Sequence, residues 1–293
     1  MREIRKVHIV YFSGTGGTAR VAGSLEKVLH DRKIEVCKTE LTTRYDTDRS
    51  ADLLVLLFPV HAFNAPKPVD EWIALSPTVK SRPAAVISVS AGGDIRPNIA
   101  CRVNVIEQLE AKGYDVCYES MLVMPSNVFK AYDDKLSAML LRALPHKAER
   151  IGNDLLSGIR KRTQAHFIDK LISRFGALEK KYGGKSFGSK LKANINCNGC
   201  SWCAKHCPRG NITMQNGRPC FGRNCVICLR CVYGCPQKAI ISGIKFIILK
   251  EGYDLKAIEE HMKRKKAGPI SKIPKGLASA GVRKYLKEKN ERY

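Results

Sequence analysis

Two runs of four cysteines, each ending in Cys-Pro, constrain this 293-residue chain more than any other feature. In each run, three cysteines stand three positions apart, and the fourth follows four positions later, directly before a proline. Every cysteine of the second run lies 28 residues after its counterpart, and Ile212 and Ile240 keep the same offset. The segment is therefore an internal repeat. Its cysteines are Cys197, Cys200, Cys203, Cys207, Cys225, Cys228, Cys231 and Cys235.

This spacing is typical of iron–sulfur ligands. Three closely spaced thiolates can wrap one cluster, while a fourth before proline points the other way. In two-cluster bacterial ferredoxins that fourth cysteine ligates the other cluster. By this similarity we assign one [4Fe–4S] cluster to Cys197, Cys200, Cys203 and Cys235, and the other to Cys225, Cys228, Cys231 and Cys207. Two structural zinc sites are the competing interpretation, although zinc ligands usually come as separated pairs.

The remaining cysteines stand outside this pattern. Cys220 is expected to be a spare thiol, and Cys37, Cys101 and Cys117 are expected to be small buried apolar residues. The aromatic residues between the ligands are expected to shield the clusters: Trp202, His206 and Tyr233.

The first half of the chain alternates short β-rich and helical stretches. This alternation predicts an α/β fold with a doubly wound parallel sheet that is covered on both faces. Strands are expected over Arg5–Phe12, Ile34–Thr39, Leu53–Phe58, Ala84–Val89 and Tyr114–Val123. Helices are expected over Thr18–His30, Val69–Leu75 and Asn98–Lys112.

A glycine-rich turn follows the first strand and reads Ser13-Gly14-Thr15-Gly16-Gly17-Thr18. Glycines let backbone N–H groups and a helix N-terminus surround an anion, and hydroxyl side chains add donors. The lysine of a Walker A loop is absent, which argues against ATP or GTP. An ordinary Gly/Thr turn is the plainer interpretation.

This turn resembles the phosphate loop of flavodoxins, which bind FMN. The resemblance implies that the loops after the third and fourth strands hold the flavin ring, where such sheets bind their ligand. Those loops are Pro59, Val60, His61, Ala62, Phe63 and Asn64, and Ser90, Ala91, Gly92, Gly93 and Asp94. His61 and Phe63 are the candidate stacking partners, and an ordinary loop histidine is the alternative for His61.

Together, the two halves resemble the EFR-type flavodoxin–ferredoxin fusion family of anaerobic bacteria and archaea. The resemblance is carried by Tyr11–Gly16, Pro59-Val60 and the block Cys197–Ile240. It implies a flavodoxin-like FMN-binding domain over 1–130, a helical linker over 131–188, a small α+β two-cluster ferredoxin domain over 189–245 and a basic extension over 246–293. It also implies electron transfer.

The linker region carries apolar residues at helical spacing over 133–180. The pattern predicts two helices broken near Pro145 and Gly158, followed by a hinge at Tyr182-Gly183-Gly184. We expect the apolar positions to pack the two domains together. Binding of an anionic membrane surface through Arg160-Lys161-Arg162 and its neighbours is the rival interpretation.

The chain holds 51 Lys and Arg against 27 Asp and Glu, for a net charge of +24, and the excess lies almost entirely in its second half. No acidic residue occurs between Glu179 and Glu251, the stretch that contains both cysteine runs. We interpret this stretch as a docking face for an acidic redox partner. No recognition motif for nucleic acid accompanies the charge, so no specific nucleic acid partner is expected. The apolar run Val7–Phe12 is too short for a signal-peptide core, and no apolar run approaches the ~18 residues that span a bilayer, so a cytoplasmic location is expected. Clustered cysteines in that compartment, where thiols stay reduced, favour metal ligands over disulfides.

These observations favour an electron carrier that connects FMN, two [4Fe–4S] clusters and a protein partner. The alternative is a reductase that acts on a small substrate at the flavin with electrons delivered through the clusters. No catalytic acid, base or nucleophile is assigned, and whether the chain is an enzyme stays open.

Overall fold

A computed structural model describes residues 3–43, 51–163, 166–263 and 277–287. Five strands form one parallel sheet in the order β2-β1-β3-β4-β5. They are β1 (Lys6–Tyr11), β2 (Glu35–Glu40), β3 (Leu53–Pro59), β4 (Arg82–Ser90) and β5 (Tyr114–Val123). Strand order 2-1-3-4-5 defines the flavodoxin-like arrangement, in which ligands bind beyond the carboxyl ends of the strands. The predicted α/β sheet is confirmed.

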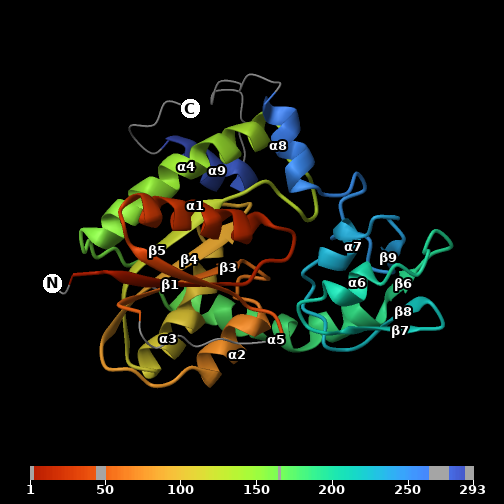
Figure 1. Ribbon diagram of the computed structural model, residues 1–293, viewed down its shortest axis with the longest axis horizontal. Helices are drawn as coiled ribbons and strands as arrows, with labels where there is room; N and C mark the ends of the chain where they lie inside the picture. The colour runs from red at the N-terminus through yellow and green to blue at the C-terminus, as the bar shows by residue number, and fades with distance from the viewer. Residues whose placement is uncertain (1–2, 44–50, 164–165, 264–276, 288–293) are drawn as a thin grey trace.

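Helices cover both faces of this sheet (Figure 1), as the near-continuous burial of β3 requires. One face is covered by α1 (Gly17–Asp31) and α4 (Asp134–Leu156), which pack against each other. The other face is covered by α2 (Lys67–Leu75) and by the 3-10 turn η1 (Asn98–Arg102), which leads into α3 (Val103–Ala111).

Helix α4 runs through Pro145, so the predicted break at that residue was wrong. A proline inside a helix costs about 3 kcal/mol. Leu141, Leu144, Ala148 and Ile151 on both sides of it are buried in one core with α1, and this packing outweighs the loss. The helix ends at Leu156 instead, and Gly158 follows with φ 66°. The break predicted at Gly158 is confirmed.

The predicted hinge at Tyr182-Gly183-Gly184 was also wrong, because these residues lie inside α5 (Phe167–Ser189). Glycine is needed here because the backbone of α5 lies close to two loops. A Cβ on Gly184 would stand 2.1 Å from the Cys225 carbonyl oxygen, and one on Gly176 would stand 2.3 Å from the Ala62 carbonyl oxygen. Any larger residue would push α5 away from both loops.

The cysteine-rich segment folds into two short antiparallel pairs and two short helices. The sequence repeat has a counterpart in the backbone. Ser201 (φ 61°) and Leu229 (φ 58°) are left-handed residues directly before α6 and α7, and buried Ile212 and Ile240 begin β7 and β9. The elements are β6 (Leu191–Ala193) paired with β9 (Ile240–Ser242), β7 (Ile212–Gln215) paired with β8 (Arg218–Phe221), α6 (Trp202–Lys205) and α7 (Arg230–Gly234).

The C-terminal segment returns to the first half of the molecule. Helices α8 (Leu255–Lys263) and α9 (Leu277–Lys287) pack on α4, and α9 also contacts β5 (Figure 1). Leu249, Tyr253, Val282 and Leu286 are buried in the same core as α1 and α4. The extension therefore completes the cover of one sheet face. The predicted domain boundaries stay predictions.

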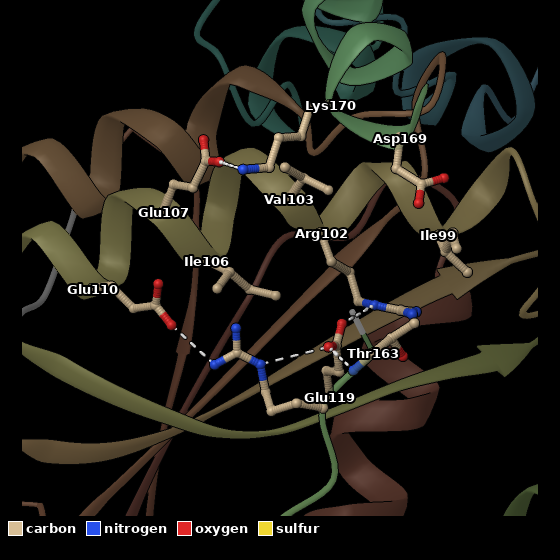
Figure 2. A pocket seen from close by; sticks show the side chains of 11 residues that line it. Ile99, Arg102, Val103, Ile106, Glu107, Glu110, Glu119, Thr163, Asp169 and Lys170 are labelled. Atoms are coloured by element: carbon tan, nitrogen blue, oxygen red, sulfur yellow. Dashed lines mark hydrogen bonds and ion pairs between the residues drawn. The ribbon is translucent and has the colours of Figure 1, made fainter. Parts of the chain in front are cut away.

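Residues 159–163 carry the chain from α4 to α5 around the edge strand β5, where Lys161 forms a parallel bridge with Tyr118. Buried Arg102 pairs with Glu119 at 2.8 Å, and Glu119 also accepts the backbone N–H of Thr163 (Figure 2). Arg162 pairs with Glu110 at 2.9 Å. These bonds border a cavity of about 480 Å³. They fasten the crossing segment to the sheet and cover its edge.

Candidate functional site

A cavity of about 780 Å³ lies beyond the carboxyl ends of the strands. The loops after β1, β3 and β4 meet there, as the sequence predicted for adjacent parallel strands. Of the predicted residues, those that line it are Ser13, Gly14, Thr15, Gly17, Thr18, Pro59, Val60, His61, Ala62, Phe63, Ser90, Ala91 and Gly92. Its volume falls within the range of about 300–1,000 Å³ that is usual for small-molecule sites.

The loop after β1 leads into a helix terminus whose N-cap residue has no side chain. Gly16 takes φ 97° directly before α1, a backbone conformation that favours glycine. Ser13 Oγ accepts the Ala19 N–H at 3.2 Å, and Thr15 Oγ1 accepts the Asn127 amide at 2.7 Å. Both hydroxyls can still donate their own protons. Backbone N–H groups and a positive helix end here suit an anion such as a phosphate.

The loop after β3 is a tight turn in which His61 and Asn64 exchange backbone hydrogen bonds at 2.8 Å. His61 and Phe63 line the cavity, and Phe63 is 39% exposed. Asn64 turns away instead, because its buried amide donates to the Ser173 carbonyl of α5. Burial, and then the charge of Lys180, lower the pKa of His61 to about 4. A neutral imidazole is therefore the form present at physiological pH.

The loop after β4 is divided between the cavity and the protein interior. Gly93 (φ 82°) packs against Gly281 of α9, where a Cβ would stand 2.5 Å from the Gly281 carbonyl carbon. Asp94 pairs with Arg102 at 2.9 Å. These two residues, like Gly16 and Asn64, support the walls of the cavity and are not among the residues that line it.

Sequence reasoning missed the other walls. They come from the segment after β5, from α5, from the second cysteine run and from the C-terminal extension. Only the segment after β5 could have been expected, because β5 ends at the same edge as the other parallel strands. The missed residues include Met124, Pro125, Ser126, Asn127, Val128, Phe129, Ser186, Phe187, Ile227, Cys228, Leu229, Ile244, Phe246, Ile247 and Tyr253.

Two tyrosines fasten these walls together. The Tyr233 hydroxyl donates to the Asn127 carbonyl and accepts the Leu249 N–H, both at 2.9 Å. The Tyr253 hydroxyl donates to the Pro125 carbonyl at 3.3 Å, and the two rings lie 6.0 Å apart. Burial raises the pKa of both hydroxyls, so both remain protonated donors.

Four of the eight repeat cysteines line one small cavity: Cys207 from the first run and Cys225, Cys228 and Cys231 from the second. None of the eight is in a disulfide. Burial, followed by the charges of Cys235 and Cys197, raises the pKa of Cys203. Burial, followed by the charges of Cys225 and Cys207, raises the pKa of Cys228 to about 12. Such mutual destabilisation of thiolates is relieved when a cation binds between them.

Within the described residues, no group of three or more His, Cys, Asp or Glu side chains is arranged to hold a single metal ion. In a four-iron cluster each thiolate ligates a different iron, so the four ligands surround the cluster without meeting at one point. In the same described ranges, no helix is both long enough and apolar enough to cross a membrane.

Comparison with known proteins gave no match to a family model and none to a curated protein. Among solved structures, the chain is similar to oxidised flavodoxin 1 from Bacillus cereus, with 14% identity over 52% of this chain and 97% of that one and a TM-score of 0.40. A flavodoxin mutant from Pseudomonas aeruginosa is 16% identical over 53% of this chain and 98% of that one, with a TM-score of 0.40.

General stress protein 14 from Treponema denticola, in complex with FMN, is 14% identical over 53% of this chain and 99% of that one, with a TM-score of 0.37. At these values the similarities carry no argument about function. The parallel strand order identifies the fold by itself: the first half of the chain has a flavodoxin-like fold.

Proposed function

We propose that this chain is an iron–sulfur flavoprotein of the EFR-type flavodoxin–ferredoxin fusion family. It would move electrons between FMN, two [4Fe–4S] clusters and an acidic protein partner. When bound, FMN exchanges two electrons and each cluster carries one, so the set can join two-electron to one-electron chemistry. So many thiols in one segment suit a cytoplasmic protein.

The grouping of the thiols carries this proposal. Cys207, from the first run, lines one small cavity together with Cys225, Cys228 and Cys231 of the second run. In the other set, burial and then the charge of Cys235, from the second run, raise the pKa of Cys203. This exchange of the fourth cysteine matches two-cluster ferredoxins. Cys220 stands apart, with its thiol 3.2 Å from Gln215 Oε1.

The volume and the lining residues of the cavity suit FMN. Backbone N–H groups and the open end of α1 can bind the phosphate at Gly14–Thr18, while the loops at Val60–Phe63 and Ser90–Gly92 can flank a flat ring. Buried Tyr253, in the extension, shields that side of the cavity from water. The chain's own task is thus to bind, orient and shield the cofactors.

Anaerobic purification followed by iron, sulfide and flavin analysis tests the proposal. We expect about eight iron, about eight acid-labile sulfide and one FMN per chain. Stoichiometric zinc in place of iron would overturn the cluster assignment. Absence of FMN, together with failure of the apoprotein to bind added FMN, would overturn the flavin assignment.

The second candidate function is reduction of a small substrate at the flavin. It is favoured by Phe129 and Phe246, which stack at 6.1 Å, line the cavity and are 68% and 72% exposed. An exposed aromatic pair at a cavity suits a flat apolar substrate. Steady-state turnover of such substrates by the reduced holoprotein, lost in Phe129→Ala and Phe246→Ala, would support an enzyme over a carrier.

A peripheral membrane contact is proposed only for the start of α5. Phe167, Ile168, Leu171 and Phe175 are exposed there, and Lys170 and Arg174 are exposed beside them. An apolar helix face edged with cations suits an anionic bilayer. Co-sedimentation with vesicles that contain anionic lipid, compared with neutral vesicles, tests this contact, and equal binding to both would contradict it.

A further inference from the structure

We propose that the two cysteine sets have different roles, a proposal that rests on the proposed function. The inner set, Cys207, Cys225, Cys228 and Cys231, holds the cluster that exchanges electrons with FMN. The outer set, Cys197, Cys200, Cys203 and Cys235, holds the cluster that exchanges electrons with an acidic one-electron carrier protein. That carrier docks on an outer tip made of Lys192, Ile195, Cys200, Arg218 and Ile241.

The inner set lies directly against the candidate phosphate loop. A Cβ on Gly14 would stand 2.3 Å from the Cys228 carbonyl oxygen, so only glycine allows this approach. Arg230 donates to the Ser13 carbonyl at 2.6 Å and to the Gly14 carbonyl at 3.1 Å, and it also pairs with Glu40. Arg230 thus fixes the start of α7, which contains Cys231, to the loop before α1.

The loop after β3 reaches the same segment. His61 and Val226, which lies between Cys225 and Cys228, line the same small cavity. Helix α5 closes on the segment from another side, because a Cβ on Gly188 would stand 2.7 Å from Cys225 Cβ. Two of the three FMN-facing loops therefore contact the cysteine segment Cys225–Cys231.

The two sets are themselves adjacent. Cys203 of the outer set and Cys231 of the inner set pack in the same cluster of side chains, and α6 contacts α7. Gly234 packs under the Trp202 ring, where a Cβ would stand 2.0 Å from the ring. Electrons could therefore pass from one cluster to the other within the cysteine-rich segment, without returning to the flavin.

The outer set faces the surface. Cys200 is exposed, and Ile195 beside Cys197 is 93% exposed. Ile241 is 48% exposed and stands in register with Lys192 across the β6–β9 pair. Arg218 donates to the Ala193 and Asn194 carbonyls at 3.0 and 2.8 Å and so fastens this loop. Figure 1 shows α7 toward the sheet and β6 at the far end of the segment.

The chemistry of the outer tip selects the kind of partner. Exposed Ile241 lies opposite Lys192, and exposed Ile195 follows Asn194, which Arg218 contacts. These side chains, in a stretch without acidic residues, suit an acidic protein that offers an apolar contact. Each reduced carrier would lose one electron at the outer tip and so be oxidised. Two such electrons, with two protons from water, would balance the two-electron reduction of one bound FMN.

Redox potentials measured on two matched arginine variants test the proposed order of electron transfer, in which the inner cluster lies next to FMN and the outer cluster next to the carrier protein. Arg230→Met removes a cation beside the inner set and loosens the phosphate loop. It should lower the equilibrium constant for reduction of one cluster about tenfold, or 59 mV for a one-electron couple, and weaken FMN binding as well. Arg218→Met should shift the reduction potential of the other cluster and leave FMN affinity unchanged. If both variants shift the potential of the same cluster, or if only Arg218→Met weakens FMN binding, the proposed order of electron transfer is wrong.

The docking surface is tested by stopped-flow reduction of the holoprotein with a small acidic ferredoxin as the probe. Ile195→Asp and Lys192→Glu should each slow reduction at least tenfold at low salt, whereas Lys27→Glu, at an exposed lysine of α1 that does not line the flavin cavity, should not. Unchanged rates in the first two variants, or slowing only in Lys27→Glu, would overturn the proposed docking surface. In either case, normal iron and FMN content would leave the proposed function standing.

Discussion

The two cysteine runs are alike in sequence and backbone but differ in their surroundings. Each has the same spacing, a left-handed residue before its short helix, and a buried isoleucine at the start of the following strand. The second run packs against Gly14, and its Arg230 donates to the Ser13 carbonyl. His61 lines a small cavity together with Val226 and Ile227 of this run. The first run leaves Cys200 exposed beside Ile195.

This difference shows which properties are local. Ligand spacing and the left-handed turn are encoded within each repeat, so both runs can bind a cluster in the same way. The neighbours that set the role of each cluster come from elsewhere in the chain, chiefly the loops after β1 and β3 and the glycines of α5. A duplicated ligand motif thus acquires two roles through tertiary contacts.

The largest expected effect separates the two sets directly. Cys228→Ser and Cys200→Ser should each alter one cluster, so iron falls toward about four per chain or one EPR signal changes. Only Cys228→Ser should also weaken FMN binding, because Cys228 lies against the phosphate loop. Iron analysis, EPR of the reduced protein and FMN titration check this. Equal effects of both variants on FMN affinity would remove the distinction.

The next effect concerns the contact between Gly14 and the Cys228 backbone. Gly14→Ala puts a methyl group 2.3 Å from the Cys228 carbonyl oxygen, so the cysteine segment must shift. We expect FMN affinity to fall about tenfold, or 1.4 kcal/mol. Gly23→Ala is the matched control, because its Cβ meets nothing within 4 Å and alanine favours α1. FMN affinity that is equal in the two variants would contradict the contact.

A smaller effect should appear as pH dependence. His61 has a folded pKa near 4, below the ordinary 6.5, so the unfolded chain binds more protons between these values. Stability is therefore fully present above about pH 6.5 and falls by up to roughly 3 kcal/mol as the pH drops to 4. Denaturant unfolding of His61→Gln should show a flatter profile. His206→Gln, at the histidine stacked on Trp202, is the control. If the free energy of unfolding depends on pH identically in the wild type and in both variants, burial of His61 does not cause the pH dependence.

The smallest effect is expected at Cys220, which belongs to neither set. Its thiol is hydrogen-bonded to Gln215 in the β7–β8 pair. Cys220→Ala should retain about eight iron per chain and unchanged potentials for both clusters. A loss of iron as large as that in Cys228→Ser would mean that the ligand sets are misassigned.

Local patterns predicted much of the fold. Strand β5 begins at Tyr114 and ends at Val123, as expected, because a β-rich run ending in three apolar residues has few alternatives. The helix break predicted at Pro145 and the hinge predicted at Gly183-Gly184 were wrong, because tertiary packing outweighed the local preferences of proline and glycine. The core around α1 holds α4 straight through the proline, and the glycines of α5 provide close contact with the cysteine segment.

The candidate site was predictable only in part. Loops at the ends of neighbouring parallel strands must lie together, so residues such as Ser13, His61 and Ser90 could be found from the sequence. Tyr253 and Phe246 carry no motif, and Tyr253 reaches the cavity because α8 and α9 fold back onto α4. No pattern within residues 246–293 encodes that return.

The central claim is that one chain holds two [4Fe–4S] clusters beside FMN. EPR spin integration of the anaerobically purified, fully reduced protein, made alongside FMN quantification, tests it most directly. The account predicts about two spins per chain from two reduced clusters, together with one FMN. A single spin, or an EPR-silent protein that contains zinc, would contradict it.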